Sequence, residues 1–241
     1  MTYGDRKAGA WPEKIHEQAD EILKRYPQGR ERSALLPLLH LVQSVDGYVS
    51  DEGIAFCAEK LDITKAQVQA VSTFYTMYKR SPAGDWLVSV CTNTLCHAKG
   101  GQRIFDALSA ELEVGHDEST PDGKFTLEHA ECLAACDYAP VVTVNYEFFD
   151  DMDEEKSLDL VHQLKEGNRP FPGRGAPLCT LKETQLILAG FDEDRRPALE
   201  ANAQGDATLA GARLAAEAGQ TAPYGDPDAP LLPETEEAVS E

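Results

Sequence analysis

The sequence predicts an α+β fold in which an N-terminal helical bundle is followed by a small α/β domain. Three observations support this prediction. Apolar residues recur at helical spacing through the first 80 residues. Between residues 81 and 170, runs that alternate apolar and polar residues, as strands do, are interspersed with helical patterns. The chain then becomes rich in Pro and Gly, and finally acidic. We therefore expect three parts, at 1–80, 81–170 and 171–241.

Four short helices are expected in the first part. Pro27 ends the first helix and Gly47 the second. Ser50 is suited to cap the third helix, and Thr64 with Gln67 forms a capping box for the fourth. Aromatic residues near the end of the fourth helix could form a docking patch, but their spacing favours the core. The positions expected to pack together are Ile15, Ala19, Ile22, Leu23, Tyr26, Leu35, Leu38, Leu39, Val42, Val45, Ile54, Cys57, Leu61, Val68, Val71, Phe74, Tyr75 and Tyr78.

The second part alternates strand and helix patterns. In chain order we expect a strand at 85–91, a helix at 101–112, a short strand at 112–114, a turn at Asp122-Gly123, a strand at 124–132, a strand at 140–149 and a helix at 154–167. A single chain of this order can build a small sheet with helices packed on it.

The third part is expected to be a linker and an extension. A Pro/Gly-rich stretch, RPFPGRGAP, occupies 169–177. Residues 192–241 hold 12 of the 42 acidic residues and few large apolar ones, so this stretch cannot build a core of its own. One helix is expected within it, at 207–219.

The net charge of −20 narrows the class of protein. Nucleic acid and anionic lipid both need cationic patches, so we expect neither as a direct partner. No apolar run approaches the roughly 20 residues of a membrane helix, and the N-terminal segment lacks the apolar stretch of a secretory signal. We expect a cytoplasmic protein without direct membrane insertion.

Four of the six cysteines form two local pairs. Cys91 and Cys96 have four residues between them, and Cys132 and Cys136 have three. Because the cytoplasm keeps thiols reduced, structural disulfides are not expected. If the strands that lead to Cys91 and Cys132 run parallel, both cysteine loops emerge at one edge of the sheet, where α/β proteins place ligand sites. We expect Cys57 in the core of the bundle instead.

Two pairs of cysteines suit a [2Fe–2S] cluster, because each of its two irons takes two thiolates. Structural zinc sites more often use tighter knuckles, and the loops here are wider. A zinc site and redox-active thiols stay open as alternatives. His97 could replace one ligand, as histidine does in Rieske centres, but four cysteines are already available. We interpret His129 as a packed strand residue. We expect Cys179 to lie outside any metal site.

The segments around these cysteines resemble a known family. The resemblance is carried by CTNTLC at 91–96 and ECLAACDYAP at 131–140, and by RYPQGRERSALLPLLHLVQSVDGYVS and VQAVSTFYTMYKRSPAG in the helical part. It covers about residues 20–165. The family is the thioredoxin-like [2Fe–2S] E-type subunit of bacterial NADH:quinone oxidoreductase, respiratory complex I. One departure is Ala134, where glycine is common; a loop with positive φ is less comfortable for alanine.

The resemblance implies a thioredoxin-like α/β [2Fe–2S] ferredoxin domain with Cys91, Cys96, Cys132 and Cys136 as cluster ligands. It implies an electron-transfer subunit of NADH dehydrogenase that accepts an electron from FMN. FMN and NADH would be bound by a neighbouring subunit of the F type, within complex I, peripheral on the inner face of the membrane. No activity is expected of the chain alone, and no catalytic residue is assigned.

Other chemistry finds little support in the sequence. No G-x-G-x-x-G motif follows a strand, AKGGQR lacks the phosphate-loop spacing, and no Ser/His/Asp set stands out. Two alternative functions remain. The chain could be the equivalent subunit of an NAD-linked formate dehydrogenase or hydrogenase, or a zinc-stabilised interaction module.

Overall fold

The computed structural model describes residues 11–191 and 205–220. The described residues fall into two units, the first ending before residue 204, and each unit is treated by itself. The remainder of the expected acidic extension, at 192–204 and 221–241, lies outside the described residues. None of the described helices is long and apolar enough to cross a membrane.

The N-terminal part is the predicted bundle of four helices. They are α1 (Glu13–Lys24), α2 (Leu35–Asp46), α3 (Asp51–Leu61) and α4 (Lys65–Phe74), with a 3-10 turn, η1 (Glu31–Ala34), before α2. Ser50 caps α3 by accepting a hydrogen bond from the Gly53 amide at 3.0 Å. Thr64 and Gln67 form the predicted capping box of α4. Both local signals therefore act as their chemistry predicts.

The expected core of the bundle is confirmed except at the end of α4. That helix ends at Phe74, and Tyr75 is extended (φ −100°, ψ 126°). Phe74 is 78% exposed and Tyr75 44% exposed, whereas Tyr78 is buried and donates its hydroxyl to the Leu36 carbonyl. The placement of Phe74 and Tyr75 in the core was wrong: Tyr75 lies beyond the helix, so helical spacing does not position it, and Phe74 is exposed on the last turn of α4.

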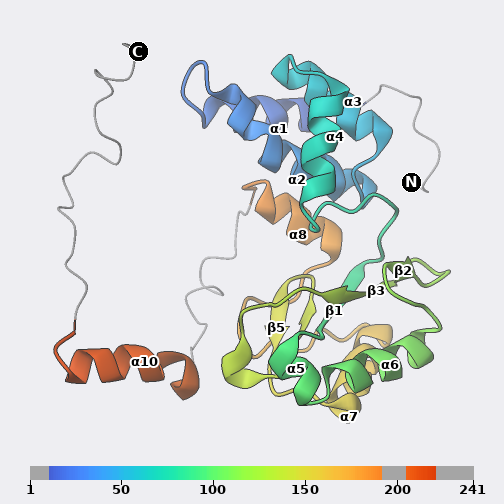
Figure 1. Cartoon of the computed structure of the whole chain (residues 1–241). Helices are drawn as coiled ribbons and strands as arrows, with labels where there is room; N and C mark the ends of the chain where they lie inside the picture. Colours follow the sequence, from blue (N-terminus) through green and yellow to red (C-terminus); the bar gives the residue numbers. More distant parts are fainter. Residues whose placement is uncertain (1–10, 192–204, 221–241) are drawn as a thin grey trace. The chain divides into compact units, whose positions relative to one another are not determined.

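A helix that was not predicted, in the part that the sequence analysis assigned to the linker and extension, completes the bundle. Helix α8 (Leu181–Leu188) packs on α2, and Figure 1 shows it between the bundle and the sheet. The buried Gln185 side chain lies 2.5 Å from His40 Nδ1. The residues before α8 are tied to the sheet, since Asn145 donates to the Cys179 carbonyl at 2.7 Å. This region is therefore part of the folded unit.

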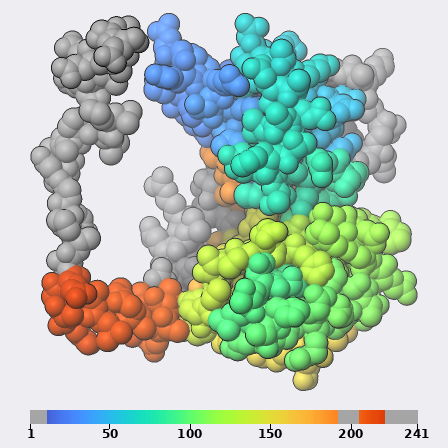
Figure 2. All heavy atoms as spheres, in the orientation of Figure 1, coloured from blue at the N-terminus to red at the C-terminus, as the bar shows by residue number. Residues whose placement is uncertain are grey.

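The second part is a five-stranded mixed sheet covered by helices. Its strands lie in the order β2 (Glu118–Ser119), β3 (Phe125–Ala130), β1 (Trp86–Cys91), β4 (Val142–Val144) and β5 (Glu147–Phe149). Only the β1–β3 pair is parallel. Helices α6 (Gly101–Leu112) and α7 (Glu154–Lys165) share one apolar core with the sheet. In Figure 2 the bundle, blue to cyan, lies directly against this green and yellow part.

Two expected strands differ in the structure. Residues 112–114 form no strand, because Leu112 ends α6 and Glu113 takes a positive φ of 55°. The expected strand at 140–149 is a hairpin of β4 and β5. Its turn residues Asn145 and Tyr146 both have positive φ, and asparagine tolerates this conformation better than most residues. A short helix, α5 (Thr94–Ala98), was also not anticipated.

The second unit contains helix α10 (Asp206–Glu217). The expected helix at 207–219 is thereby confirmed.

Candidate metal centre

The parallel pairing of β1 and β3 brings the two cysteine loops together. Cys91, the last residue of β1, lies opposite Ala130, the last residue of β3. Cys132 follows two residues beyond the end of β3. The expectation that both loops leave the sheet at one edge is therefore confirmed.

The first pair of cysteines is buried. After Cys91 the chain turns into α5, which returns Cys96 toward Cys91, and each is 2% exposed. Burial, and then the hydrogen bond with Cys91, raise the pKa of the Cys96 thiol to about 11. Gly101 packs the start of α6 against this loop: a Cβ there would lie 2.4 Å from the Cys91 carbonyl oxygen, so a larger residue would displace the loop.

The second pair of cysteines lies at the surface. Cys132 and Cys136 are exposed and flank the loop residues Leu133, Ala134 and Ala135. Ala134 has a φ of 55°, the strained conformation that the sequence suggested for this position. Partial desolvation, and then the hydrogen bond with Cys132, raise the pKa of the Cys136 thiol.

The two pairs are close to each other. The charge of Cys136 interacts with those of both Cys91 and Cys96. Cys91 and Cys96 pack with Ala135, Ala139 and Val141 in a small apolar cluster that joins the two loops. Four cysteines from distant parts of the sequence thus meet at one edge of the sheet.

The chemistry of these thiols fits a cationic group. Thiols that lie close together resist ionisation, because their negative charges would repel each other. A cationic iron that binds the thiolates would offset this repulsion. Across residues 11–191 and 205–220, no three His, Cys, Asp or Glu side chains gather around one point as for a single ion. Two pairs of thiols suit a [2Fe–2S] cluster, because each of its two irons takes two thiolates.

The remaining cysteines and histidines have other surroundings. Cys57 is fully buried in the bundle, as expected. None of the six cysteines, all within the described ranges, forms a disulfide. His97 is exposed on α5. His129 stacks on Phe105, with ring centroids 3.5 Å apart, and its Nδ1 lies 3.2 Å from the Thr92 hydroxyl, so this histidine supports the first cysteine loop.

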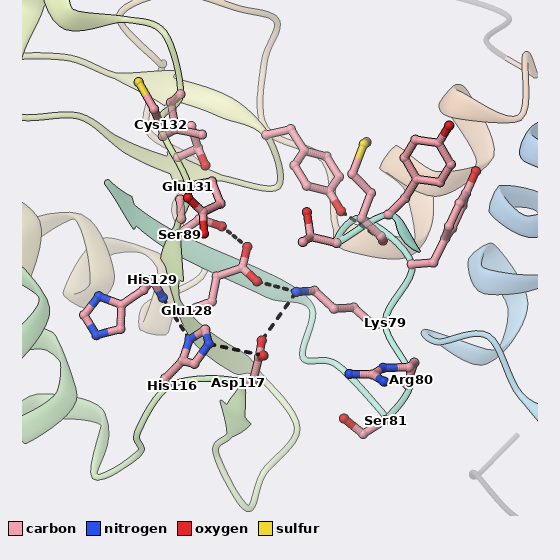
Figure 3. Close-up of a pocket in the computed structure, with 18 of the residues that line it drawn as sticks. Lys79, Arg80, Ser81, Ser89, His116, Asp117, Glu128, His129, Glu131 and Cys132 are labelled. Atoms are coloured by element: carbon pink, nitrogen blue, oxygen red, sulfur yellow. Dashed lines mark hydrogen bonds and ion pairs between the residues drawn. The ribbon is translucent and has the colours of Figure 1, made fainter. Parts of the chain in front are cut away.

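A hollow beside Cys132 contains an ion pair that sequence reasoning missed. The hollow has a volume of about 770 Å³ and is lined by residues from both the bundle and the sheet. Figure 3 shows Glu128, from β3, directed toward Lys79, which also lies 3.6 Å from Asp117. Glu128 accepts a hydrogen bond from Ser89 at 2.6 Å. The sequence carried no clear signal for this pair, because Glu128 alternates with the core residues Phe125 and Leu127 and so falls on the opposite face of β3.

Comparisons with known proteins identify the family and relatives of this chain. Residues 19–165 match the family model of the thioredoxin-like [2Fe–2S] ferredoxin. A Mycobacterium tuberculosis protein, named as the E subunit of NADH-quinone oxidoreductase, is 52% identical, over 87% of this chain and 82% of its own length. The Rickettsia typhi protein of the same name is 39% identical, over 60% of this chain and 86% of its own length.

A solved structure shows the same fold. A chain of an NAD⁺-reducing [NiFe]-hydrogenase in the air-oxidised state superposes with a TM-score of 0.50 at 17% identity. The match covers 55% of this chain and 23% of the hydrogenase chain.

Proposed function

The chain belongs to the thioredoxin-like [2Fe–2S] ferredoxin family and, within it, to the E-type subunits of NADH-quinone oxidoreductase, and from this we propose that Cys91, Cys96, Cys132 and Cys136 hold one [2Fe–2S] cluster. Through it the protein takes single electrons from the reduced FMN of a neighbouring subunit. The observation that carries the proposal is the meeting of two thiol pairs at the shared edge of β1 and β3.

The buried and the exposed cysteine pair have different roles. When bound, the cluster supplies one-electron redox chemistry. Cys91 and Cys96 shield one side from water, since both are buried. Cys132 and Cys136 are exposed and leave the other side open to a partner. We therefore expect the flavin-bearing subunit to contact the two ligand loops, around 92–95 and 133–139.

The same reasoning assigns the remaining cofactors to partners. The sequence carries no glycine-rich nucleotide motif, so FMN and NADH belong on the neighbouring F-type subunit of the complex. Assembly with the rest of complex I would hold this chain at the inner face of the membrane. Identity of 52% to a protein named as the E subunit of NADH-quinone oxidoreductase, over 87% of this chain, supports this complex.

The test is anaerobic mixing of the purified holoprotein with NADH, with and without the flavin-bearing subunit, followed by low-temperature EPR. We expect no reduced cluster with NADH alone and a reduced [2Fe–2S] signal once the flavin subunit is present. A Cys132→Ala variant mixed with the same partner is the control and should give no such signal. Reduction by NADH in the chain alone would refute the role of a passive electron carrier.

A further inference from the structure

The Pro/Gly-rich stretch at 169–177 is fixed to the edge of the sheet. Arg174 and Phe148 exchange backbone hydrogen bonds of 3.0 and 3.3 Å, which add a bridge beside β5. The Ala176 amide donates to Glu147 Oε2 at 2.8 Å. Gly175 has a φ of 125°, and a Cβ there would lie 1.8 Å from the same carboxylate oxygen. Glycine is therefore required at this position, and the stretch holds Arg174 in a defined place.

The Arg174 side chain reaches the second cysteine loop. Its Nη1 donates to Asp137 Oδ2 at 3.0 Å, and Asp137 directly follows Cys136. Its Nη2 donates to Asp150 Oδ1 at 2.6 Å. The guanidinium also lies 5.6 Å from the ring centroid of Tyr138 and 5.5 Å from that of Phe148. One cation thus joins the cysteine loop to the end of β5.

The surroundings keep this cation charged and close to the loop. The Arg174 side chain is 18% exposed, and the hydrogen bond to Asp150 raises the pKa of its guanidinium. An open hollow of about 350 Å³ is lined by Leu133, Ala134 and Ala135 together with Arg174 and Gly175. Arg174 and the residues between Cys132 and Cys136 therefore share one surface.

One polar atom of the Arg174 side chain is left without a partner in the described part of the chain. Arg174 Nε is buried and finds no hydrogen-bond partner among the described residues. A buried donor without a partner is energetically unfavourable. The contacts of Arg174 with Asp137 and Asp150 offset this cost, and they place the charge of the guanidinium beside the second cysteine loop.

We propose that Arg174 is a positioning residue for the second cysteine pair, which holds the loop through Asp137 and sets the electrostatic potential at the cluster. The inference rests on the proposed function, in that it takes Cys136 as a ligand. Arg174 lies outside the matched family segment, which ends at residue 165. Reduction adds one negative charge, and a nearby fixed cation favours the reduced form. Loss of the Arg174 charge, with both carboxylates retained, should therefore make the reduction potential more negative.

The test compares four variants of the full-length holoprotein. Arg174→Gln removes the charge, and Arg174→Lys keeps the charge but loses the two-pronged contact. Arg169→Gln is the matched control, since Arg169 lies in the same stretch, 3.7 Å from Glu183 and over the Trp86 ring. Asp150→Asn leaves the Asp137 contact in place and removes one negative charge. The readouts are the midpoint potential, from an EPR-monitored redox titration, and the rate of cluster loss to a chelator.

Arg174→Gln should shift the potential in the negative direction and speed cluster loss about 10-fold, the scale of effect known for residues that support metal ligands. Arg174→Lys should keep a potential near that of the unchanged protein but lose its cluster faster. Asp150→Asn should shift the potential in the positive direction, and Arg169→Gln should change neither quantity. The proposal is overturned if Arg174→Gln matches the unchanged protein, if Arg169→Gln has the same effect, or if Asp150→Asn lowers the potential.

A measurement on the cluster-free protein separates this inference from the proposed function. Hydrogen exchange of the backbone amides at 132–139 should be faster in Arg174→Gln than in Arg169→Gln, whether or not a cluster can be loaded. Equal exchange in the two variants would refute the positioning role. Absence of iron and sulfide from the unchanged protein would refute the proposed function instead.

Discussion

Cys91 lies opposite Ala130 at the ends of the two parallel strands of the sheet. This register determines where both cysteine loops begin. Cys96 returns toward Cys91 on α5, and Cys132 and Cys136 follow just beyond β3. The candidate metal centre therefore depends on the pairing of segments about forty residues apart in the chain, and each part of it can be tested separately.

Replacement of any one ligand should remove the cluster. Alanine at Cys91, Cys96, Cys132 or Cys136 leaves an iron with an incomplete set of thiolates. We expect loss of the visible absorbance in each of these four variants. Alanine at Cys57 or Cys179 provides the matched control and should leave the spectrum intact. Retention of the cluster in the Cys91 variant, together with its loss in the Cys179 variant, would show that the ligands are assigned wrongly.

Glycine at position 134 should stabilise the second loop. Ala134 has a φ of 55°, a conformation that costs an L-residue about 1–2 kcal/mol and costs glycine little. Part of that gain is offset because glycine is more flexible in the unfolded chain. Ala134→Gly should therefore slow cluster release, and Ala134→Val should accelerate it. The rates can be followed by absorbance in the presence of a chelator. Faster release from the glycine variant would show that the conformation of Ala134 does not destabilise the loop.

The ion pair of Lys79 and Glu128 should hold the chain after the bundle to the sheet. Both side chains are mostly buried, at 11% and 14% exposure. Lys79→Met leaves the glutamate without its cation and should lower the free energy of unfolding by about 3 kcal/mol. The double variant with Glu128→Gln should lose less than the sum of the two single changes. Urea denaturation measures each value.

An exposed ion pair serves as the control for that experiment. Arg103 and Glu154 are 72% and 48% exposed. Arg103→Ala should change the free energy of unfolding by no more than about 1 kcal/mol. A Lys79→Met variant that loses no more than this control would show that the buried pair does not stabilise the fold.

His40 should make the stability of the bundle sensitive to acid. Burial lowers the pKa of His40 below its ordinary value of 6.5, against a smaller opposing effect of Gln185. As the pH falls below about 6.5, the unfolded chain binds a proton at His40 more readily than the folded chain does. The contribution of neutral His40 to the free energy of unfolding is therefore complete above about pH 6.5 and declines as the pH falls. His40→Gln, which stays neutral, should lose less stability between about pH 7.5 and about pH 5.5. Equal losses in urea denaturation would contradict this.

The sequence predicted the elements whose signals are local. Capping at Ser50 and Thr64 needs only neighbouring residues, and the cysteine pairs could be recognised from their spacing and surroundings. Contacts between distant residues were missed. Arg174 meets Asp137, 37 positions away, and Gln185 meets His40, 145 positions away. A Pro/Gly-rich stretch reads as a linker because nothing within it shows that a sheet edge and two carboxylates will bind it.

The exposed Phe74 and Tyr75 illustrate a different difficulty. Their spacing continues the apolar pattern of α4, but the helix ends at Phe74. Where a helix ends depends on how the next segment packs. Here the residues after α4 are held by other elements: Tyr78 donates to the Leu36 carbonyl of α2, and Lys79 pairs with Glu128 of β3.

The most direct test of the central claim is the iron and acid-labile sulfide content of the anaerobically purified chain, combined with EPR after chemical reduction. The account predicts two irons and two sulfides per chain, and an EPR signal of a reduced [2Fe–2S] centre that is absent before reduction. The quadruple Cys→Ala variant should contain neither. A colourless protein that binds one zinc through the same cysteines, without sulfide, would contradict the account.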